Sequence, residues 1–574
     1  MLKKTTLFLS IAIASATFLH ADAPIPPIIS SADRFHPEIG ASGMVVSRET
    51  VATEEGLKVL QAGGNAIDAA VVTHFVLAVT TPQAGNIGGG GFMIIHHDEE
   101  DETVALDYRE KAPQAAHRDL FLDEEGNADS EKSRYSHVAA GIPGSVAGMA
   151  KALETYGTLS WAEALAPAIR VAREGFPVSR DLAFSLDSGK ARLLANGEAK
   201  DVFFKSDNTP YVFGEILKLP LLADTLEKIA EGGPEVFYEG EIAAALVADM
   251  EANDGIWTME DLAAYEAIFR EPAMGNYQGY TIASMPPPSS GGVHIVQMLN
   301  VLEPYDLKAL GHNSSAYIHL LSGAMQHAYA DRSKHLGDSD FYPVPLEWLT
   351  SKEYGHEIRD KLNRFAAVQA LEVSPGEAPQ EGDQTTHFSI VDGDGNAVSC
   401  TTTVNFSFGN KYLVPGLGFF LNNEMDDFSA KPGVPNAYGL VGGEANAIEA
   451  QKRMLSSMSP TLILDENGDI FMVAGSPGGS RIITATLQAI LNVIDHEMNI
   501  AEAVSEARFH NQWLPDAIYF EEGLNLDSIR ILESMGYTLR QRTRVGNVNA
   551  IVKKGEYLYG AADPRALAGS AKGF

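Results

Sequence analysis

The sequence predicts a protein of mixed α and β structure, because segments with helical patterning and segments with strand patterning both occur along the chain. Two helices are expected near the start, over residues 53–61 and 65–79. The stretch 136–269 is rich in helix formers and carries glycine and proline at the ends of its segments. Two β-rich runs within residues 385–405 predict an antiparallel hairpin.

Residues that favour the ends of helices and strands support this assignment. Asn65 is suited to cap the second helix, because its side chain can accept a hydrogen bond from a free backbone N–H group. A glycine-rich loop, residues 81–91, leads into an expected strand at Phe92. No Lys-Ser/Thr pair follows the loop and a strand comes next, so tight backbone packing is favoured over phosphate binding. A proline-rich turn, residues 285–292, precedes an expected helix at Val293.

The composition is that of a large, acidic, globular protein. The chain has 574 residues, of which 45% are hydrophobic and 21% charged, and its formal net charge is −34. Such a chain can bury an extensive core. A surface this negative repels nucleic acid and anionic membranes, so we expect neither as a partner. The sequence shows no metal-binding cluster, and we expect neither a metal nor a cofactor.

The first 23 residues are typical of a secretory signal. Two lysines precede an apolar run over residues 7–19, and small residues follow at Ala21 and Ala23. The run is shorter than the roughly 20 residues that a membrane-spanning helix needs. We therefore expect a signal peptide over residues 1–21, with a cut no later than residue 23, and a periplasmic or extracellular protein. No later segment predicts a membrane span in the mature form.

The character of the chain changes between Asn363 and Gln384. Residues 374–383, Ser-Pro-Gly-Glu-Ala-Pro-Gln-Glu-Gly-Asp, have the composition of an exposed, flexible linker. Strand patterning begins immediately afterwards, at Thr385. A boundary is therefore expected between Gln384 and Thr385.

The hairpin that follows has a register fixed by its turn, Asp392-Gly-Asp-Gly-Asn. If the turn centres on Asp394, Thr385 lies opposite Thr403, and alternation of side chains then gives the hairpin two unlike faces. The polar face is expected to comprise Thr385, His387, Ser389, Ser399, Thr401 and Thr403. The apolar face is expected to comprise Phe388, Ile390, Val398 and Cys400. Cys400, the only cysteine, is therefore expected to be packed and unreactive.

Thr385 is a candidate nucleophile because of its position rather than its residue type. Threonines on a strand are usually explained by β propensity and cross-strand hydrogen bonds. A hydroxyl becomes a nucleophile only when a base takes its proton, and the α-amine of an N-terminal threonine, with an unperturbed pKa of about 7.7–8.0, can do so. Cleavage between Gln384 and Thr385 would create both groups on one residue. Thr403 would then assist from across the hairpin.

Short motifs occur in a fixed order along the whole chain. They include Gly64-Asn-Ala-Ile-Asp-Ala-Ala, Pro82-Gln-Ala-Gly-Asn-Ile-Gly-Gly-Gly-Gly-Phe, Asp107-Tyr-Arg-Glu, Gln384-Thr-Thr-His-Phe-Ser, Leu421-Asn-Asn-Glu-Met-Asp-Asp-Phe-Ser, Leu455-Ser-Ser-Met-Ser-Pro and Gly475-Ser-Pro-Gly-Gly-Ser-Arg. In content and order they resemble the γ-glutamyltransferases of the N-terminal-nucleophile hydrolase superfamily. The resemblance extends from Gly43 to Arg565.

The resemblance implies a single α+β fold, a four-layer αββα sandwich built from two fragments of one precursor. The fragments would be a large subunit, residues 22–384, and a small subunit, residues 385–574, that begins with the catalytic threonine. It also implies an enzyme that cleaves the γ-glutamyl bond of glutathione and related compounds. The acyl group would pass through a Thr385 ester to amino acids, peptides or water.

A γ-glutamyl group carries an α-ammonium and an α-carboxylate, so its pocket needs acids and donors at fixed separations. Glu424 and Asp427 are three residues apart and would face one way on a helical turn. The resemblance implies that they bind the ammonium group, with Asn405 assisting. It also implies that Arg109 binds the carboxylate, for which a planar guanidinium is well shaped.

The remaining site residues are also implied by the resemblance. Ser456 and Ser457 would be further carboxylate donors, although Met454 stands where many members have proline, which leaves the rigidity of that loop open. Gly478 and Gly479 would provide backbone N–H groups for the oxyanion, and a tight turn after the strand at 470–474 is compatible with that role. Residues 428–440 resemble the lid loop of the family, with Tyr438 at the substrate mouth.

Two alternatives remain open on the sequence alone. On the same fold, a cephalosporin or glutaryl-type acylase would prefer substrates without the α-ammonium group, although the lid loop argues for γ-glutamyl substrates. From another class, the chain could be an unprocessed, non-catalytic binding protein. An intact Gln384-Thr385 pair and the presence of Thr403 argue against that reading.

Overall fold

The structure is a computed structural model that describes residues 34–363, 365–367, 370, 385–431, 433 and 442–574. The expected signal peptide, the expected linker with Gln384, and Tyr438 lie outside the described residues.

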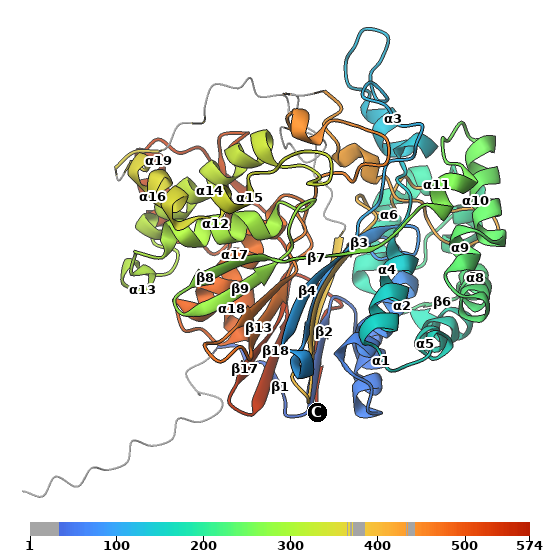
Figure 1. Cartoon of the computed structure of the whole chain (residues 1–574), viewed down its shortest axis with the longest axis horizontal. Helices are drawn as coiled ribbons and strands as arrows, with labels where there is room; N and C mark the ends of the chain where they lie inside the picture. Colours follow the sequence, from blue (N-terminus) through green and yellow to red (C-terminus); the bar gives the residue numbers. More distant parts are fainter. Residues whose placement is uncertain (1–33, 364, 368–369, 371–384, 432, 434–441) are drawn as a thin grey trace, which may run out of the picture.

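Two seven-stranded sheets form the centre of the molecule (Figure 1). The first has the order β1 (Glu38–Gly40), β18 (Tyr557–Ala562), β17 (Asn549–Lys554), β13 (Ile470–Gly475), β12 (Thr461–Leu464), β9 (Tyr280–Ser284), β8 (Ala273–Tyr277). The second has the order β19 (Ser570–Gly573), β2 (Gly43–Ser47), β10 (Thr385–Asp392), β11 (Ala397–Thr403), β3 (Gly90–His97), β4 (Glu102–Tyr108), β7 (Ile268–Arg270). Neighbouring strands within both sheets are antiparallel.

Helices cover the outer face of each sheet, as Figure 1 shows. One layer contains α1 (Thr50–Gln61), α2 (Ala66–Thr80), α4 (Ser145–Tyr156), α5 (Trp161–Glu174) and α8 (Pro220–Gly232). The other contains α12 (Gly291–Leu302), α14 (Ser315–His335), α16 (Lys352–Lys361) and α17 (Arg481–Ile494). Helix α2 packs on β10 and β11, and α17 packs on β13. The mixed α and β composition and the four-layer sandwich are therefore confirmed.

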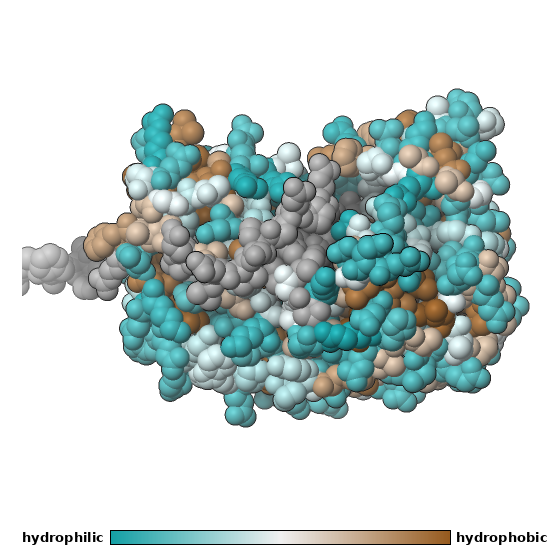
Figure 2. Space-filling model, turned by 90° about the horizontal axis from the view of Figure 1, so that it is seen from above, coloured by the Kyte–Doolittle hydropathy of each residue, from teal (hydrophilic) through white to brown (hydrophobic). Residues whose placement is uncertain are grey.

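Further helices fill the middle of the chain, as its composition predicted. They are α6 (Arg180–Leu193), α7 (Gly197–Phe203), α9 (Glu235–Tyr238), α10 (Glu241–Ala252) and α11 (Met259–Ala263). The face seen from above in Figure 2 is mostly hydrophilic, with hydrophobic residues gathered to the right of centre. A polar surface agrees with the high net charge.

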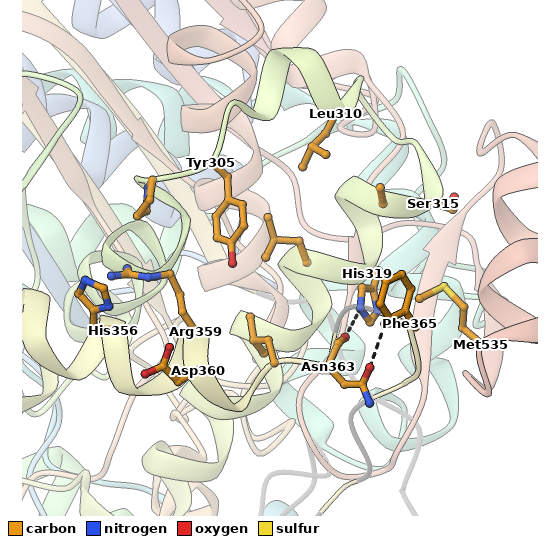
Figure 3. A pocket seen from close by; sticks show the side chains of 14 residues that line it. Tyr305, Leu310, Ser315, His319, His356, Arg359, Asp360, Asn363, Phe365 and Met535 are labelled. Atoms are coloured by element: carbon orange, nitrogen blue, oxygen red, sulfur yellow. Dashed lines mark hydrogen bonds between the residues drawn. The ribbon is translucent and has the colours of Figure 1, made fainter.

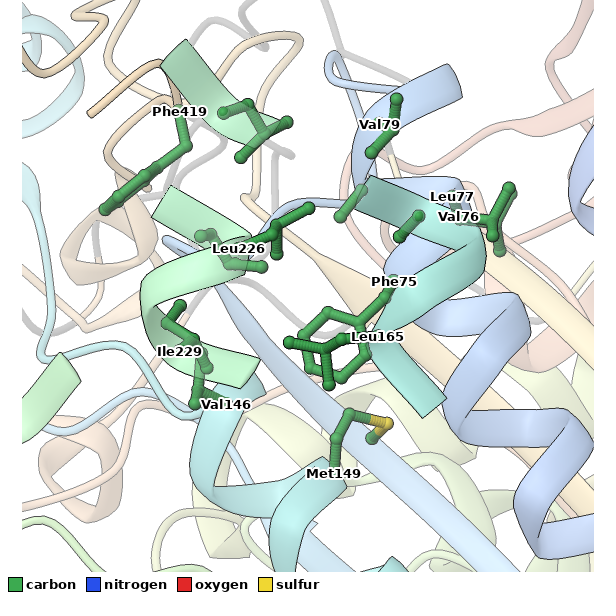
Figure 4. Close-up of a cluster of buried hydrophobic side chains, with 14 of the residues drawn as sticks. Phe75, Val76, Leu77, Val79, Val146, Met149, Leu165, Leu226, Ile229 and Phe419 are labelled. Carbon is green, nitrogen blue, oxygen red and sulfur yellow. The ribbon is translucent and has the colours of Figure 1, made fainter. Parts of the chain in front are cut away.

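Three apolar layers hold the sandwich together. The alternating side chains of strand β2 contribute to two of these layers. Met44 and Val46 pack between the two sheets, and Val45 packs against the helices. In the helix-side layer, Phe75 of α2 lies close to Leu165 and Met149 (Figure 4). Helix α2 is buried along its whole length, so it forms the centre of that layer.

The predicted cap of α2 and the predicted packing of the glycine loop are confirmed. Asn65 caps α2 and forms a capping box with Asp68, whose carboxylate accepts a hydrogen bond from the Asn65 N–H at 3.0 Å. The glycine loop packs tightly rather than forming an open cradle. A β-carbon on Gly89 would lie 2.0 Å from the carbonyl oxygen of Thr403, and one on Gly88 would lie 2.2 Å from that of Phe420. The loop therefore supports the end of β11 from behind.

The predicted hairpin register is also confirmed. Thr385 is the partner of Thr403, and Phe388 is the partner of Cys400. The apolar face joins the helix-side core, where Cys400 is fully buried and lies 3.1 Å from the Tyr108 hydroxyl. Burial raises the pKa of the Cys400 thiol to about 12. The only cysteine therefore has little thiolate character at neutral pH.

Candidate active site

Thr385 and Thr403 lie side by side at one end of the hairpin, where β10 begins and β11 ends. Their face of the hairpin is turned toward the other sheet. The Ser389 hydroxyl donates to the carbonyl of Asn549 in β17 at 3.1 Å, and the Ser399 hydroxyl donates to that of Ala474 in β13 at 3.0 Å. The threonine pair is therefore anchored to both sheets of the sandwich.

The backbone of Thr385 is held by Arg48, which follows β2. Arg48 Nη1 donates to the Thr385 carbonyl oxygen at 3.0 Å, and Arg48 Nε lies 3.5 Å from a carboxylate oxygen of Asp181. The Thr403 hydroxyl oxygen accepts a hydrogen bond from the N–H of Asn405 at 2.8 Å, which leaves its proton available for donation. Across the described chain, no hydrogen bond joins the two threonine hydroxyls.

Glu424 and Asp427 lie on the short 3₁₀ helix η3 (Glu424–Asp427), in which side chains three residues apart project from the same side. Both carboxylates reach Arg109. Its Nη1 donates to Glu424, and its Nη2 donates to Asp427 at 2.5 Å. The structure thus brings together the three charged residues that the sequence singled out, and it pairs them with one another.

Arg109 is held in place by residues from three segments of the chain. Its backbone N–H donates to Asp107 at 3.0 Å, its Nε donates to the carbonyl oxygen of Met454 at 3.3 Å, and its carbonyl oxygen accepts from the Tyr265 hydroxyl at 2.8 Å. Met454 is fully buried. At the position where many members have proline, the chain therefore uses a packed side chain and a backbone carbonyl to hold the arginine.

A third carboxyl group in this cluster, that of Glu110, was not predicted from the sequence. It is fully buried, and one of its oxygens lies 3.6 Å from Arg109 Nη1. Burial raises the pKa of Glu110 to about 7, and burial also raises the pKa values of Glu424 and Asp427. For Arg109, burial opposes the charge, but the attraction of Glu424, Asp427 and Glu110 outweighs it and raises the pKa.

Ser456 and Ser457 lie in the same loop as Met454 and are arranged as hydrogen-bond donors. The Ser456 hydroxyl oxygen accepts from the N–H of Met458 at 3.1 Å, and the Ser457 hydroxyl oxygen accepts from Nη2 of Arg332 at 3.2 Å. Within the described residues, neither hydroxyl donates a hydrogen bond of its own. Both protons are therefore available to an anion.

Gly478 and Gly479 form the turn between β13 and α17. Their φ angles are +134° and +57°, a region of backbone conformation that favours glycine. Their N–H groups have no hydrogen-bond partner in the part of the chain that the structure describes. Such free donors suit an oxyanion. Gly479 lines the cavity with Thr385, whereas Gly478 does not.

One small cavity unites these residues. It is lined by Arg109, Arg332, Thr385, Thr403, Asn405, Glu424, Asp427, Ser456, Ser457, Met458, Gly479, Ser480 and Ile482. Its volume is about 20 Å³. That is close to the room that one water needs, roughly 10–15 Å³. The Arg109 guanidinium and the two acids are paired with each other in its wall, so a charged ligand that binds there competes with these ion pairs.

A larger cavity of about 700 Å³ lies elsewhere, beside α14 and α16 (Figure 3). Its lining includes His319, Arg359 and Phe365, and it contains no residue of the threonine hairpin. The ring nitrogens of His319 are bonded to the Tyr537 hydroxyl at 2.8 Å and to the carbonyl of Asn363 at 2.6 Å. Size alone therefore does not mark the reactive site.

Among the residues that the structure describes, no group of three or more His, Cys, Asp or Glu side chains is placed to hold a metal ion. In the same part of the chain, no helix combines the length and apolarity needed to cross a membrane.

Three comparisons bear on this site. A family model described as gamma-glutamyltranspeptidase matches residues 52–573. The chain is 47% identical over 574 residues to the glutathione hydrolase proenzyme of Escherichia coli K12, covering 98% of each chain.

Two solved structures are also similar. Helicobacter pylori gamma-glutamyltranspeptidase matches 57% of this chain and 93% of its own at 45% identity, with a TM-score of 0.55. A cephalosporin acylase from Bacillus halodurans matches 96% of this chain and 99% of its own at 26% identity, with a TM-score of 0.82.

Proposed function

The chain belongs to the γ-glutamyltranspeptidase family, and on this premise we propose that it cuts itself before Thr385 and then uses Thr385 to transfer or hydrolyse γ-glutamyl groups. The chain is an enzyme of the γ-glutamyltransferase and glutathione hydrolase class. The observation that carries the assignment of roles is that one cavity contains Thr385 together with two guanidinium groups, two carboxylates and the hydroxyl groups of Ser456 and Ser457.

Self-cleavage begins with the Thr385 hydroxyl. Its oxygen attacks the carbonyl carbon of Gln384, the peptide C–N bond breaks, and the nitrogen gains a proton to become a free α-amine. Water then hydrolyses the resulting ester, which leaves Gln384 as a carboxylate and returns the hydroxyl. Arg48, by holding the Thr385 carbonyl, limits the freedom of the attacking residue. The products are a large subunit, residues 22–384, and a small subunit, residues 385–574.

The catalytic cycle uses both groups of the new terminus. The α-amine takes the hydroxyl proton, and the oxygen attacks the γ-carbonyl of the donor, for instance glutathione. The free N–H groups of Gly478 and Gly479 stabilise the oxyanion, a contribution of about 3–4 kcal/mol for one donor in other enzymes. The first amine leaves with the proton. An amino acid, a peptide or water then attacks the γ-glutamyl ester and regenerates Thr385.

Substrate binding exchanges one set of ion pairs for another. The α-ammonium group of the substrate replaces Arg109 as the ion-pair partner of Glu424 and Asp427, and Asn405 lies beside them. The α-carboxylate then accepts hydrogen bonds from Arg109, Ser456 and Ser457. Because the substrate is a zwitterion, the charges of the buried site stay balanced. A zwitterion thus avoids the cost of leaving a buried charge unpaired.

A glutaryl-type acylase is the competing activity, since one structural relative is a cephalosporin acylase. The acid pair argues against it. A glutaryl group has no ammonium to neutralise Glu424 and Asp427, so its carboxylate would compete with them for Arg109. Export to the periplasm or outside the cell is proposed from the sequence of the first 23 residues.

Two measurements test the proposal. Mass spectrometry of the purified protein reports self-cleavage, and release of the coloured aniline from a γ-glutamyl anilide (dye release) reports activity. We expect two fragments, the smaller with the mass of residues 385–574, and dye release that rises with an added dipeptide acceptor. A single intact mass with no dye release would contradict it. Two fragments with a preference for glutaryl anilide would favour the acylase.

Thr403→Val tests the role of the second threonine. The change removes the hydroxyl while keeping the shape, so processing should slow and kcat should fall by about 10- to 100-fold with little change in KM. The rate of fragment formation and steady-state kinetics on processed enzyme measure both effects.

Thr402→Val is the matched control for that change. Thr402 lies on the opposite face of β11 and donates to the carbonyl of Gly90 at 3.0 Å. It should process normally and keep its kcat. An unchanged kcat in fully processed Thr403→Val would show that the second hydroxyl has no part in the reaction.

A further inference from the structure

Arg332, in the last turn of α14, is a buried cation that the sequence did not single out. It is 5% exposed and lines the same cavity as Thr385 and Arg109. Among the described residues it forms no ion pair with a carboxylate. Its Nε donates to the Ser290 hydroxyl at 3.0 Å, and its Nη2 donates to the Ser457 hydroxyl at 3.2 Å.

This arrangement is unlike that of three other deeply buried arginines. Arg109 is paired with Glu424 and Asp427, Arg508 with Asp563, and Arg453 with Asp107. A buried charge whose hydrogen-bond partners are all neutral is costly to the fold. Burial lowers the pKa of Arg332 to about 10 although the nearby Asp427 carboxylate opposes that shift, so Arg332 is still a cation at neutral pH. The structure thus keeps a positive charge next to the cavity, near Asp427 but without a carboxylate in direct contact among the described residues.

The contact with Ser457 determines what that hydroxyl can do. Because the Ser457 oxygen accepts from a guanidinium, its proton must be donated elsewhere, and the cation strengthens it as a donor. Ser290 extends the support, since its hydroxyl accepts from Arg332 and donates to the carbonyl of Ser456 at 2.9 Å. Arg332 therefore contacts the Ser457 hydroxyl directly and supports the backbone of Ser456 through Ser290.

The charges of the cavity are unevenly distributed. Arg109 is already engaged by Glu424 and Asp427, and Glu110 lies 3.6 Å away. When a substrate ammonium group engages the acids, the α-carboxylate still needs positive potential on the serine side of the cavity. Arg332 is the group placed to supply it.

We propose that Arg332 is a positioning and specificity-determining residue for the α-carboxylate of the substrate, acting through Ser457, which it holds as a hydrogen-bond donor and backs with a positive charge. The inference rests on the proposed function, since it names a further determinant of the same site. It predicts that loss of Arg332 weakens the reaction of substrates that carry an α-carboxylate and has little effect on substrates that lack it.

The test compares γ-glutamyl anilide with 4-aminobutyryl anilide, which keeps the ammonium group and lacks the carboxylate. In R332M, kcat/KM for γ-glutamyl anilide should fall by about 10- to 100-fold, the range for a lost hydrogen bond to a charged group, mainly through KM. The loss for 4-aminobutyryl anilide should be less than about 3-fold, within the scatter of such measurements. R332K keeps the charge and should recover part of the lost activity.

A double-mutant cycle with S457A separates positioning from general support of the fold. If Arg332 acts through Ser457, the R332M and S457A losses overlap, and the double variant is only slightly worse than either single one. Additive losses, or equal losses on both anilides, would overturn the inference. Normal formation of two fragments checks that each variant folds, and R332K with S457A carries the test if R332M does not.

The outcomes also distinguish this inference from the proposed function. Wild-type enzyme without any preference for γ-glutamyl over glutaryl anilide would refute the function itself. A wild-type preference that R332M keeps in full would refute only the role of Arg332.

Discussion

Thr385→Ala is expected to yield an intact precursor with no γ-glutamyl transfer or hydrolysis, because one hydroxyl starts both reactions. In other enzymes, removal of the nucleophile costs about 10⁶-fold in kcat, so the residual rate should be near background. The alanine side chain is smaller, and Thr385 already lies at the start of a strand whose ladder to β11 involves only the backbone. The fold should therefore survive. Mass spectrometry and dye release measure the two effects separately.

Two neighbouring changes make the result specific. Thr385→Ser keeps a hydroxyl and should retain some processing and some activity. Thr386→Ala changes the next residue, whose side chain alternates to the other face of the hairpin, and it should be cut normally. Recovery of the two normal fragments from Thr385→Ala would remove the basis of the nucleophile assignment.

Local signals were sufficient to predict the hairpin and the geometry of its threonines. The turn residues fixed the register, and the two-residue period of a strand then decided which side chains share a face. The pairing of Thr385 with Thr403 follows from those two facts alone. Similarly, the cap at Asn65 and the three-residue spacing of Glu424 and Asp427 are local properties that tertiary contacts did not override.

Contacts between distant segments were beyond such reasoning. Arg332 stands in the last turn of a long helix, where a basic residue is normally explained by the helix dipole. Its bond to Ser457 joins segments 125 residues apart. Arg48 is likewise one basic residue at the start of a helix, and nothing local shows that it reaches Thr385. Glu110 could not be identified from local sequence either, because its carboxyl group belongs to the site only through burial beside Arg109 in the fold.

The mutual pairing of Arg109 with both acids was also not predicted, and it has a physical cause. The resemblance assigns Arg109 to the α-carboxylate and the two acids to the α-ammonium group, which are attached to the same carbon of the substrate. In the structure these buried charges pair with one another. The cavity that they line has a volume of about 20 Å³. Binding must therefore separate buried ion pairs, which makes recognition depend on both charges of the substrate at once.

Arg109→Met and Asp427→Asn are expected to have opposite substrate profiles. Loss of one partner of a buried, hydrogen-bonded charge pair typically costs about 2–5 kcal/mol. Arg109→Met should show losses of that size on γ-glutamyl and glutaryl anilides, which carry the carboxylate, and much smaller losses on 4-aminobutyryl anilide. Asp427→Asn should lose most on γ-glutamyl and 4-aminobutyryl anilides, which carry the ammonium group, and least on glutaryl anilide. Part of each loss should be in kcat, because remote binding energy also positions the carbonyl over Thr385.

The two variants should also differ in stability, which provides an internal check on the ion-pair geometry. Arg109→Met leaves Glu424 and Asp427 buried without their cation, so its thermal unfolding temperature should fall clearly. In Asp427→Asn the bond between Arg109 and Glu424 remains, and the change in unfolding temperature should be small. Kinetics on all three anilides are therefore measured well below the unfolding temperature of each variant. Equal losses of kcat/KM on the three substrates would mean that these residues support the fold and do not bind the charged groups of the substrate.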